Sequence, residues 1–188
     1  MLKAARAELR AAKNALEHMS NAESFEEYED YWRQLLNCLE KCWNKAERGC
    51  QHVRDQFQPW QGRTQNLRKK DMLLRYLKQA RDADNHSIQE LAEHRPGGTG
   101  LGFPNGSGHI KRLEIVNGEI VHYEGDPVTL THYPSRLLVK SVVNSGKWYN
   151  PPTSHLEKPL NSADPRILGK LGIEFYERFI DEAETKFF

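Results

Sequence analysis

The sequence has neither a long apolar segment nor many cysteines. In 188 residues, no apolar run approaches the roughly 20 residues that a membrane-spanning helix needs. The first residues include basic side chains, but no apolar segment follows them, and acidic Glu8 and Glu17 lie close behind. These features argue against a signal peptide and against a transit peptide. We therefore expect a cytoplasmic protein that does not associate with a membrane.

The three cysteines, Cys38, Cys42 and Cys50, all fall within one predicted helix. Cysteines this close together cannot form a disulfide framework that spans the chain, and they have no metal-ligand partners on nearby turns, so we expect reduced thiols. The glycine-rich run 98–102 also fails as a phosphate-binding loop, because no strand precedes it and no helix follows it. We therefore predict no cofactor and no metal.

The residues that are present can build a core. Hydrophobic residues make up 38% of the sequence and charged residues 28%, with four Trp, seven Tyr and seven Phe. Disordered chains lack this aromatic content, and a chain of this length can bury a core without disulfides. The net charge of +1 is unevenly distributed, because residues 63–81 are strongly basic with Asp71 as the single acid. Such a run is compatible with phosphate contacts or with a solvated helix face that pairs with acidic neighbours.

Apolar residues recur in steps of three and four over most of the chain, which is typical of amphipathic helices. Pro59 and Gly62 are expected to end the second of these helices, and Pro96 the third. Asp164-Pro165 is a strong start signal for the last one. The predicted helices cover about 2–19, 24–57, 64–94 and 164–188.

The pattern changes between the third and the last predicted helix. Residues 96–108 are rich in glycine and are expected to form a flexible loop. Asn117-Gly118 is a strong hairpin signal between two segments of alternating pattern. The predicted strands cover 109–116, 119–124, 127–131 and 137–143.

The predicted fold is therefore mainly α, an antiparallel bundle of about four long helices with a small antiparallel β insertion before the last helix. We expect residues 1–188 to form a single domain. Within it, three bundle helices would occupy 1–95, the glycine-rich loop 96–108, the β insertion 109–163 and the closing helix 164–188.

One short polar stretch on the third predicted helix carries the side chains of a candidate catalytic site. Residues 81–86 read Arg-Asp-Ala-Asp-Asn-His. On a helix, Asp82 and His86 lie about 40° apart, and Arg81 and Asn85 form the neighbouring ridge. An imidazole exchanges protons near neutral pH, and a guanidinium can hold a phosphate and stabilise developing negative charge. Cleavage of RNA through its own 2′-hydroxyl needs these two functions.

This stretch resembles the motif of HEPN ribonucleases, which are small antiparallel helical bundles. Their signature is an arginine, four to six residues and a histidine, which Arg81 and His86 match, with polar Asp82 directly after the arginine. The resemblance covers the motif and the helical organisation, but not the β segment. It implies a metal-independent endoribonuclease in which Arg81 and His86 are catalytic and Asp82 is accessory. It also implies RNA as substrate, a homodimer in which two motifs meet, and a role in a toxin–antitoxin or anti-phage defence system with a partner protein.

Basic residues on the N-terminal side of the motif would guide RNA to it, because phosphate groups are attracted to lysine and arginine. We expect them on the same helix as the motif. The candidate RNA contacts are Lys69, Lys70, Arg75 and Lys78, with the amide of Asn85.

Other interpretations of the same residues stay open. Arg81 and His86 also suit an ordinary polar helix surface. Asp84 falls on the apolar stripe, so it needs a partner such as an Arg, Trp or Tyr of a facing helix. A second function class is a non-catalytic interaction or oligomerisation module, in which the second helix seeds oligomerisation and the β segment presents a binding surface. A metal site would combine Asp82, Asp84 and His86 with His94 and His109.

The β segment carries further polar and aromatic residues that form no recognisable motif. Trp148 and Tyr149 suit either an aromatic patch for a partner or core packing. The histidines of this segment have no ligand-like spacing, and we expect half-exposed strand residues. They are His109, His122, His132 and His155.

Overall fold

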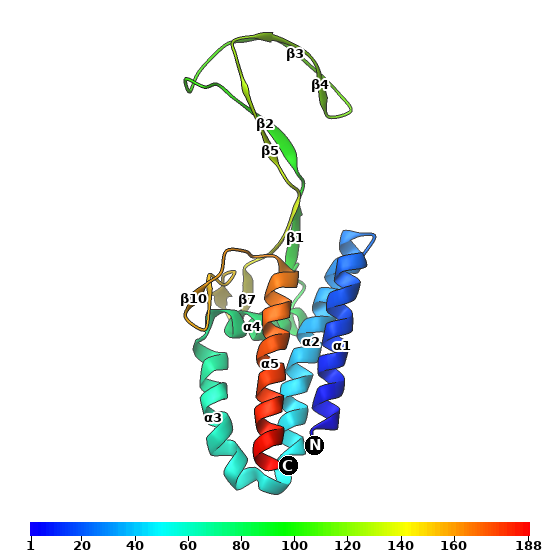
Figure 1. Cartoon of the computed structure of the whole chain (residues 1–188), viewed down its shortest axis with the longest axis vertical. Helices are drawn as coiled ribbons and strands as arrows, with labels where there is room; N and C mark the ends of the chain where they lie inside the picture. Colours follow the sequence, from blue (N-terminus) through cyan, green and yellow to red (C-terminus); the bar gives the residue numbers. More distant parts are fainter. The chain divides into compact units, whose positions relative to one another are not determined.

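The computed structural model describes residues 1 to 188, and it divides into two compact units (Figure 1). The first, the helical unit, consists of Met1–His94 and Leu137–Phe188. The second, the β unit, consists of Arg95–Arg136. None of the helices has the length and apolar character that a membrane span requires.

Three long helices form the centre of the helical unit: α1 (Lys3–Asn21), α2 (Phe25–Gly49) and α5 (Pro165–Phe187). They lie side by side, with α1 antiparallel to α2 and α5 (Figure 1). Their buried faces carry the apolar residues that recur in steps of three and four, as the sequence predicts. The fully buried residues of this centre include Ala5, Ala12, Trp32, Leu35, Leu168 and Ile180.

Two glycines let α5 approach its neighbours closely. A Cβ at Gly169 would lie 2.9 Å from a methyl carbon of Leu35 on α2. A Cβ at Gly172 would lie 2.7 Å from a methyl carbon of Leu77. Both distances are too short for real carbon contacts, so the packing of α5 depends on these two positions having no side chain.

The continuous third helix predicted over 64–94 is wrong. The chain instead forms α3 (Arg54–Lys70) and α4 (Met72–His86), with Asp71 between them. The extended backbone of Asp71, with φ −64° and ψ 132°, ends α3. Its carboxylate then accepts a hydrogen bond from Leu74 N at 2.9 Å and caps α4.

The same carboxylate ties α4 to a later part of the chain. It accepts a hydrogen bond from Leu156 N at 2.6 Å and bonds to Nδ1 of His155 at 3.0 Å. These residues belong to the small antiparallel pair β9 (Ser154–His155) and β10 (Lys158–Pro159). One buried side chain therefore lies where α3 ends, caps α4, and holds a turn whose residues follow 84 and 85 positions later in the chain.

The helix α3 also passes through Pro59 and Gly62, which were expected to be helix stops. A short 3₁₀ helix, η1 (Gln51–Val53), separates it from α2. Trp60 stacks on Phe179 of α5 with ring centroids 5.4 Å apart. This aromatic packing outweighs the loss of one helical hydrogen bond at the proline, because tertiary contacts contribute more to helix stability than local preference.

The helical unit contains short strands beside α4. Tyr76 of α4 donates a hydrogen bond from its hydroxyl to the carbonyl oxygen of Lys140 at 2.6 Å. Val142 is fully buried nearby. The strands are β1 (Ala92–Arg95) paired with β6 (Arg136–Val139), and β7 (Val142–Asn144) paired with β8 (Lys147–Tyr149).

The β unit consists of two antiparallel pairs. The hairpin predicted around Asn117-Gly118 is confirmed, with positive φ angles of 52° and 84° at these residues. The glycine-rich segment, in contrast, is not a simple loop, because part of it is a strand. The pairs are β2 (Gly98–Gly102) with β5 (Thr129–Tyr133), and β3 (Ile110–Val116) with β4 (Glu119–Gly125).

The fold class is therefore mixed α/β, and the prediction of a mainly α bundle of four helices is wrong. Five α-helices and η1 hold 54% of the residues, and strands hold 22% in two-stranded antiparallel sheets. Two physical causes explain the difference. Asp71 divides one predicted helix into two, and the backbone from Ala92 onward pairs with distant segments that apolar periodicity does not reveal.

We predict that Asp71→Ala lowers the free energy of unfolding by about 2–4 kcal/mol, because it removes the α4 cap and leaves Leu156 N and His155 without their acceptor. Urea denaturation followed by circular dichroism measures this. Burial alone would raise the pKa of Asp71, but the hydrogen bonds from His155 and from Leu74 N and Leu156 N hold it below its usual value.

The stabilisation that Asp71 provides depends on pH. Because the folded-state pKa is depressed, the stabilisation is present above the unfolded pKa of about 3.9 and disappears as the pH falls below it. The difference between the parent and Asp71→Ala should shrink in that range. The control is Asp55→Ala, since Asp55 is exposed in the first turn of α3. Equal losses for both variants would contradict the role of Asp71.

Candidate functional site

The polar stretch 81–86 forms the last turns of α4. The buried face of this helix, with Leu73, Leu77 and Ala80, packs into the core. Arg81, Asp84 and Asn85 lie at the edge of this buried face, beside α2. The motif stands at a helix end, whereas the continuous third helix predicted from the sequence would have placed it in the interior.

Two acceptors orient the side chain of Arg81. Its Nη1 donates to Oδ1 of Asp82 at 2.9 Å, and its Nε donates to Oδ1 of Asn37 on α2 at 3.3 Å. The Arg81 side chain is 27% exposed. No protein group accepts a hydrogen bond from Nη2, so this end of the guanidinium is available to a ligand.

Asp82 holds the arginine in this orientation. Its other oxygen accepts a hydrogen bond from Nζ of Lys78 at 2.5 Å. Burial alone would raise the pKa of Asp82, but the hydrogen bonds from Lys78 and Arg81 outweigh burial and lower the pKa. The carboxylate is therefore ionised at neutral pH and is occupied by two cations. Its geometry suits a positioning residue rather than a proton donor.

His86 and Asn85 complete the strip. His86 is the exposed last residue of α4 and has no hydrogen bond or ion pair in the structure. Its imidazole lies one helical turn from Asp82, on the same side of the helix. Nδ2 of Asn85 lies 3.5 Å from Oδ1 of Asn37, the atom that also accepts from Arg81. The end of α4 thus presents an exposed imidazole on the face that carries Asp82, and an oriented guanidinium five residues earlier in the chain.

Asp84 has the partner that its position on the apolar stripe requires. The prediction of an Arg, Trp or Tyr on a facing helix is confirmed, and the partner is Arg33. Its Oδ1 lies 3.0 Å from Nε of Arg33 on α2. A second contact, of 3.1 Å, joins Nη2 of Arg33 to Oε2 of Glu29. Burial raises the pKa of Asp84 in spite of the attraction of Arg33. This ion pair fixes α4 against α2 behind the polar strip.

The residues of the alternative metal site do not come together. Asp84 is paired with Arg33 and Asp82 with two cations, while His109 belongs to the β unit. No group of three or more His, Cys, Asp or Glu side chains is arranged to hold a metal ion.

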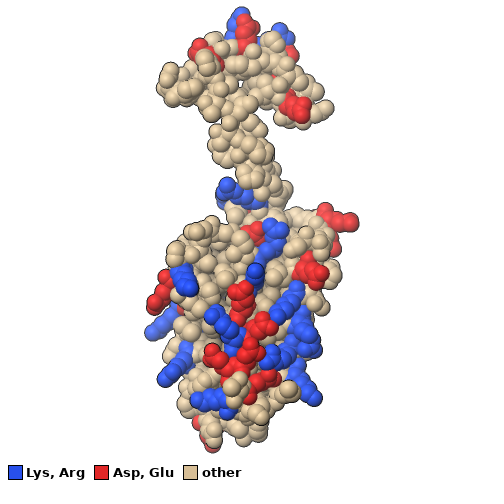
Figure 2. All heavy atoms as spheres, in the orientation of Figure 1, with Lys and Arg blue, Asp and Glu red and all other residues tan.

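The predicted basic residues are divided between two helices. Lys69 and Lys70 end α3, whereas Arg75 and Lys78 belong to α4, so the expectation of a single basic helix is wrong. Arg75 is exposed, and Lys78 is bound to Asp82. Figure 2 shows lysine and arginine interleaved with acidic residues on the drawn face of the helical unit. On that face the charges form no continuous basic patch.

One member of the basic run is a core residue. Arg68 is 5% exposed, and it forms an ion pair with Glu40 and donates from Nε to the hydroxyl of Tyr176 at 2.8 Å. Its guanidinium carbon lies 4.2 Å from the centroid of the Trp43 ring. Arg68 therefore joins α3 to α2 and α5, and it does not contribute to an RNA-binding surface.

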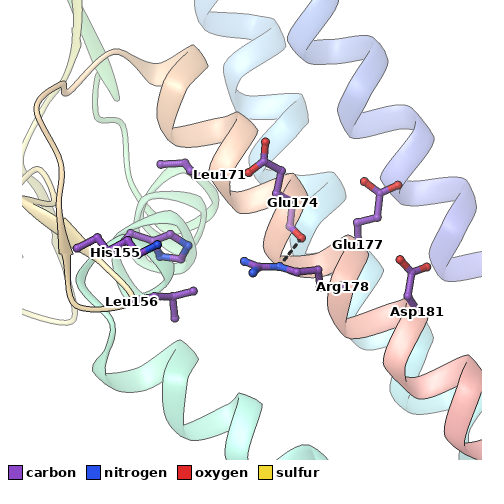
Figure 3. A pocket seen from close by; sticks show the side chains of 8 residues that line it. His155, Leu156, Leu171, Glu174, Glu177, Arg178 and Asp181 are labelled. Atoms are coloured by element: carbon purple, nitrogen blue, oxygen red, sulfur yellow. Dashed lines mark hydrogen bonds between the residues drawn. The ribbon is translucent and has the colours of Figure 1, made fainter.

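A cavity of about 590 Å³ lies elsewhere in the helical unit. Figure 3 shows His155 and Leu156 on one side of it, and Glu174 and Arg178 of α5 on the other. His155 is 7% exposed, so the prediction of a half-exposed strand residue is wrong. Its Nε2 is buried without a partner, and its Nδ1 bonds to Asp71. Because the free nitrogen does not reach the cavity surface, the Asp71–His155 pair acts as a structural brace.

Asn37 is a further residue of the site, and it was not predicted from the sequence. Its amide oxygen accepts from both Arg81 and Asn85, but it lies 44 residues before Arg81 in the chain. No local sequence pattern distinguishes Asn37, because it is one of several partly exposed polar residues on α2. Only the packing of α4 on α2 brings it to the motif.

Comparison of the chain with protein-family models, curated proteins and solved structures gives no match.

We predict that Arg33→Met lowers the free energy of unfolding by about 1–3 kcal/mol, because it leaves the partly buried Asp84 and Glu29 without their cation. The matched variant Asp84→Asn should change it by less than about 1 kcal/mol, because Arg33 keeps Glu29 and the raised pKa of Asp84 shows that its charge is unfavourable there. Chemical denaturation of both variants measures the two changes. A larger loss for Asp84→Asn than for Arg33→Met would contradict this description of the pair.

Proposed function

We propose that the chain is a HEPN-like, metal-independent endoribonuclease whose chemistry is carried by Arg81 and His86. The observation that carries the proposal is the arrangement at the end of α4. The guanidinium of Arg81 is oriented by Asp82 and Asn37, and an exposed imidazole stands one turn from Asp82. Both groups of the arginine–histidine motif thus lie in the last turns of α4, with His86 exposed and Arg81 27% exposed.

In this reaction, the imidazole of His86 takes the proton from a ribose 2′-hydroxyl. The 2′-oxygen attacks the adjacent phosphorus, and the bond from phosphorus to the 5′-oxygen breaks. Water returns a proton to the leaving oxygen, so the products are a 2′,3′-cyclic phosphate and a 5′-hydroxyl. Arg81 donates from the open side of its guanidinium to the phosphate oxygens, where negative charge increases in the transition state.

Asp82 and Asn37 have supporting roles in this proposal. They hold the guanidinium in one orientation before the substrate binds, which lowers the reorganisation needed in the transition state. Asn85, Lys78 and Arg75 are the candidate RNA contacts on α4. Lys69 and Lys70 would act from the end of α3.

The resemblance to HEPN ribonucleases extends the proposal to partners. By it, the protein is a homodimer, acts on RNA and works in a toxin–antitoxin or anti-phage defence system with a partner protein. We also infer a cytoplasmic location, which three free thiols support. Cys38, Cys42 and Cys50 are buried and unpaired. Burial raises the pKa of the Cys42 thiol to about 12 and that of Cys50 to about 11, which leaves both unreactive at neutral pH.

A second function, a non-catalytic interaction module, is favoured by the β unit. Ile115, Val121 and Leu130 are each more than half exposed there, at 57%, 56% and 57%. The stripe of α2, which this alternative used for oligomerisation, is not available, because Trp32 and Leu35 are fully buried within the chain. Binding through the β unit would therefore have to use these strand residues.

The nuclease proposal predicts that the purified protein cleaves labelled RNA in the presence of EDTA. Arg81→Ala and His86→Ala should each lower the rate by about 100-fold or more, as expected for loss of charge stabilisation or of general acid–base catalysis. Arg10→Ala and His132→Ala are the matched controls, because both residues are exposed and lie outside the strip. Their rates should equal that of the parent.

The positioning role of Asp82 predicts a specific change in the kinetic constants. Asp82→Asn should lower the catalytic rate about 10-fold and leave the Michaelis constant for RNA within about 2-fold, because the arginine loses orientation and not charge. Circular dichroism establishes that each variant is folded. Cleavage that survives in Arg81→Ala and His86→Ala would contradict the proposed site, and a parent protein that cleaves neither total RNA nor tRNA would contradict the function.

A further inference from the structure

The hairpin of β3 and β4 has two different faces and no core of its own. Leu113 lies opposite Tyr123, and both are partly buried. On the other face, Arg112 lies opposite Glu124 and Glu114 opposite His122. A two-stranded hairpin of this kind is at best marginally stable in water, whereas three or more strands with an apolar face are stable.

The outer edge of β3 is unpaired. Its sheet contains β3 and β4 only, so the seven residues of β3 present backbone donors and acceptors on the side away from β4. Ile115 and Val116 on this strand are 57% and 53% exposed. The strand also carries Lys111, Arg112 and Glu114. Charged side chains on an edge strand disfavour pairing, unless the partner strand places opposite charges across from them.

The charges of the β unit indicate what kind of partner fits. It contains four basic residues and four acidic ones, so neither a nucleic acid nor an anionic membrane is attracted to it by net charge. Figure 2 shows both signs close together at the β3–β4 end, and none on the tan β2–β5 pair. A suitable partner strand therefore carries both basic and acidic side chains, placed so that each lies opposite a residue of the other sign.

From these observations we infer that the edge of β3 pairs antiparallel with β3 of a second copy of the chain, about a twofold axis at Leu113. In this register Arg112 faces Glu114 of the partner subunit, and Glu114 faces Arg112 of the partner subunit. Leu113 faces its own counterpart. Within one chain Arg112 forms an ion pair with Glu114. In this register each Arg112 also meets the carboxylate of Glu114 of the partner subunit, and Leu113 meets Leu113, which is the arrangement that stabilises neighbouring strands.

The neighbouring registers of this β3–β3 pair are unfavourable. When two copies of β3 pair antiparallel, the twofold axis between them is perpendicular to the sheet. Residues that lie opposite each other must point to the same face, so one residue of β3 always lies opposite the same residue of the partner subunit. A shift of the axis to the neighbouring residue on either side therefore places Arg112 opposite Arg112 or Glu114 opposite Glu114 of the partner subunit. Like charges in direct opposition are destabilising. The three central residues pair regularly with β4, and the register irregularities lie outside them, so their alternation is intact.

Pairing in this way produces a four-stranded sheet in the order β4, β3, β3 and β4. One of its faces joins the Leu113 and Tyr123 side chains of both copies, and the other joins the charged residues. The inference goes beyond the nuclease proposal and does not depend on it, because Arg112, Leu113 and Glu114 belong to the β unit and Arg81 and His86 to the helical unit.

The test is sedimentation velocity of the full chain with charge-reversal variants. The parent should dimerise, and Arg112→Glu and Glu114→Arg should each raise the dissociation constant of the dimer at least about tenfold, because each creates two like-charge contacts. The double variant should return it to within about threefold of the parent. Glu119→Arg is the matched control, because Glu119 is exposed and lies on β4, away from the paired edge.

Disulfide trapping tests the register directly. Leu113→Cys should form a disulfide-linked dimer under mild oxidation, because this residue faces itself across the axis. Ile115→Cys should not, because residue 115 lies two residues away from the axis and its two copies are too far apart for a disulfide. A parent that stays monomeric at high concentration would overturn the inference. So would a dimer that all charge variants leave unchanged, or equal trapping at 113 and 115. A loss of RNA cleavage in Arg81→Ala would leave these results unaffected, so the two proposals can fail separately.

Discussion

The buried carboxylate of Asp71 is the interaction on which the rest of the helical unit depends. It ends α3, caps α4 through Leu74 N, and bonds to His155 and Leu156 from the segment before α5. The direction of α4 follows from this break, and with it the position of the polar strip beside α2. The orientation of the candidate catalytic arginine is therefore a consequence of a cap that lies ten residues earlier in the sequence.

Local signals in the sequence predicted those elements whose cause is local. The start of α5 at Pro165 and the Asn117-Gly118 hairpin are both confirmed, because neighbouring residues determine them. The pairing of Asp84 with a facing arginine was also predictable, since a carboxylate on an apolar stripe requires a partner.

Elements that depend on contacts with residues far away in the sequence were not predictable in this way. The course of α3 through Pro59 depends on aromatic residues of α5, and the strand within the glycine-rich segment depends on β5. The same distinction holds for the site. The motif residues are visible in the sequence, whereas Asn37 becomes a site residue only through packing, and Arg68 leaves the basic run only because Glu40 and Tyr176 surround it.

The central claim is that the strip at the end of α4 cleaves RNA through the 2′-hydroxyl of the substrate. It is tested most directly by analysis of the ends produced from an RNA oligonucleotide, beside the same oligonucleotide with a single 2′-deoxy residue at the cleavage position. The proposal predicts a 2′,3′-cyclic phosphate and a 5′-hydroxyl from the RNA, and no cleavage at the deoxy position. Products with a 3′-hydroxyl and a 5′-phosphate, or cleavage of the deoxy substrate, would contradict it.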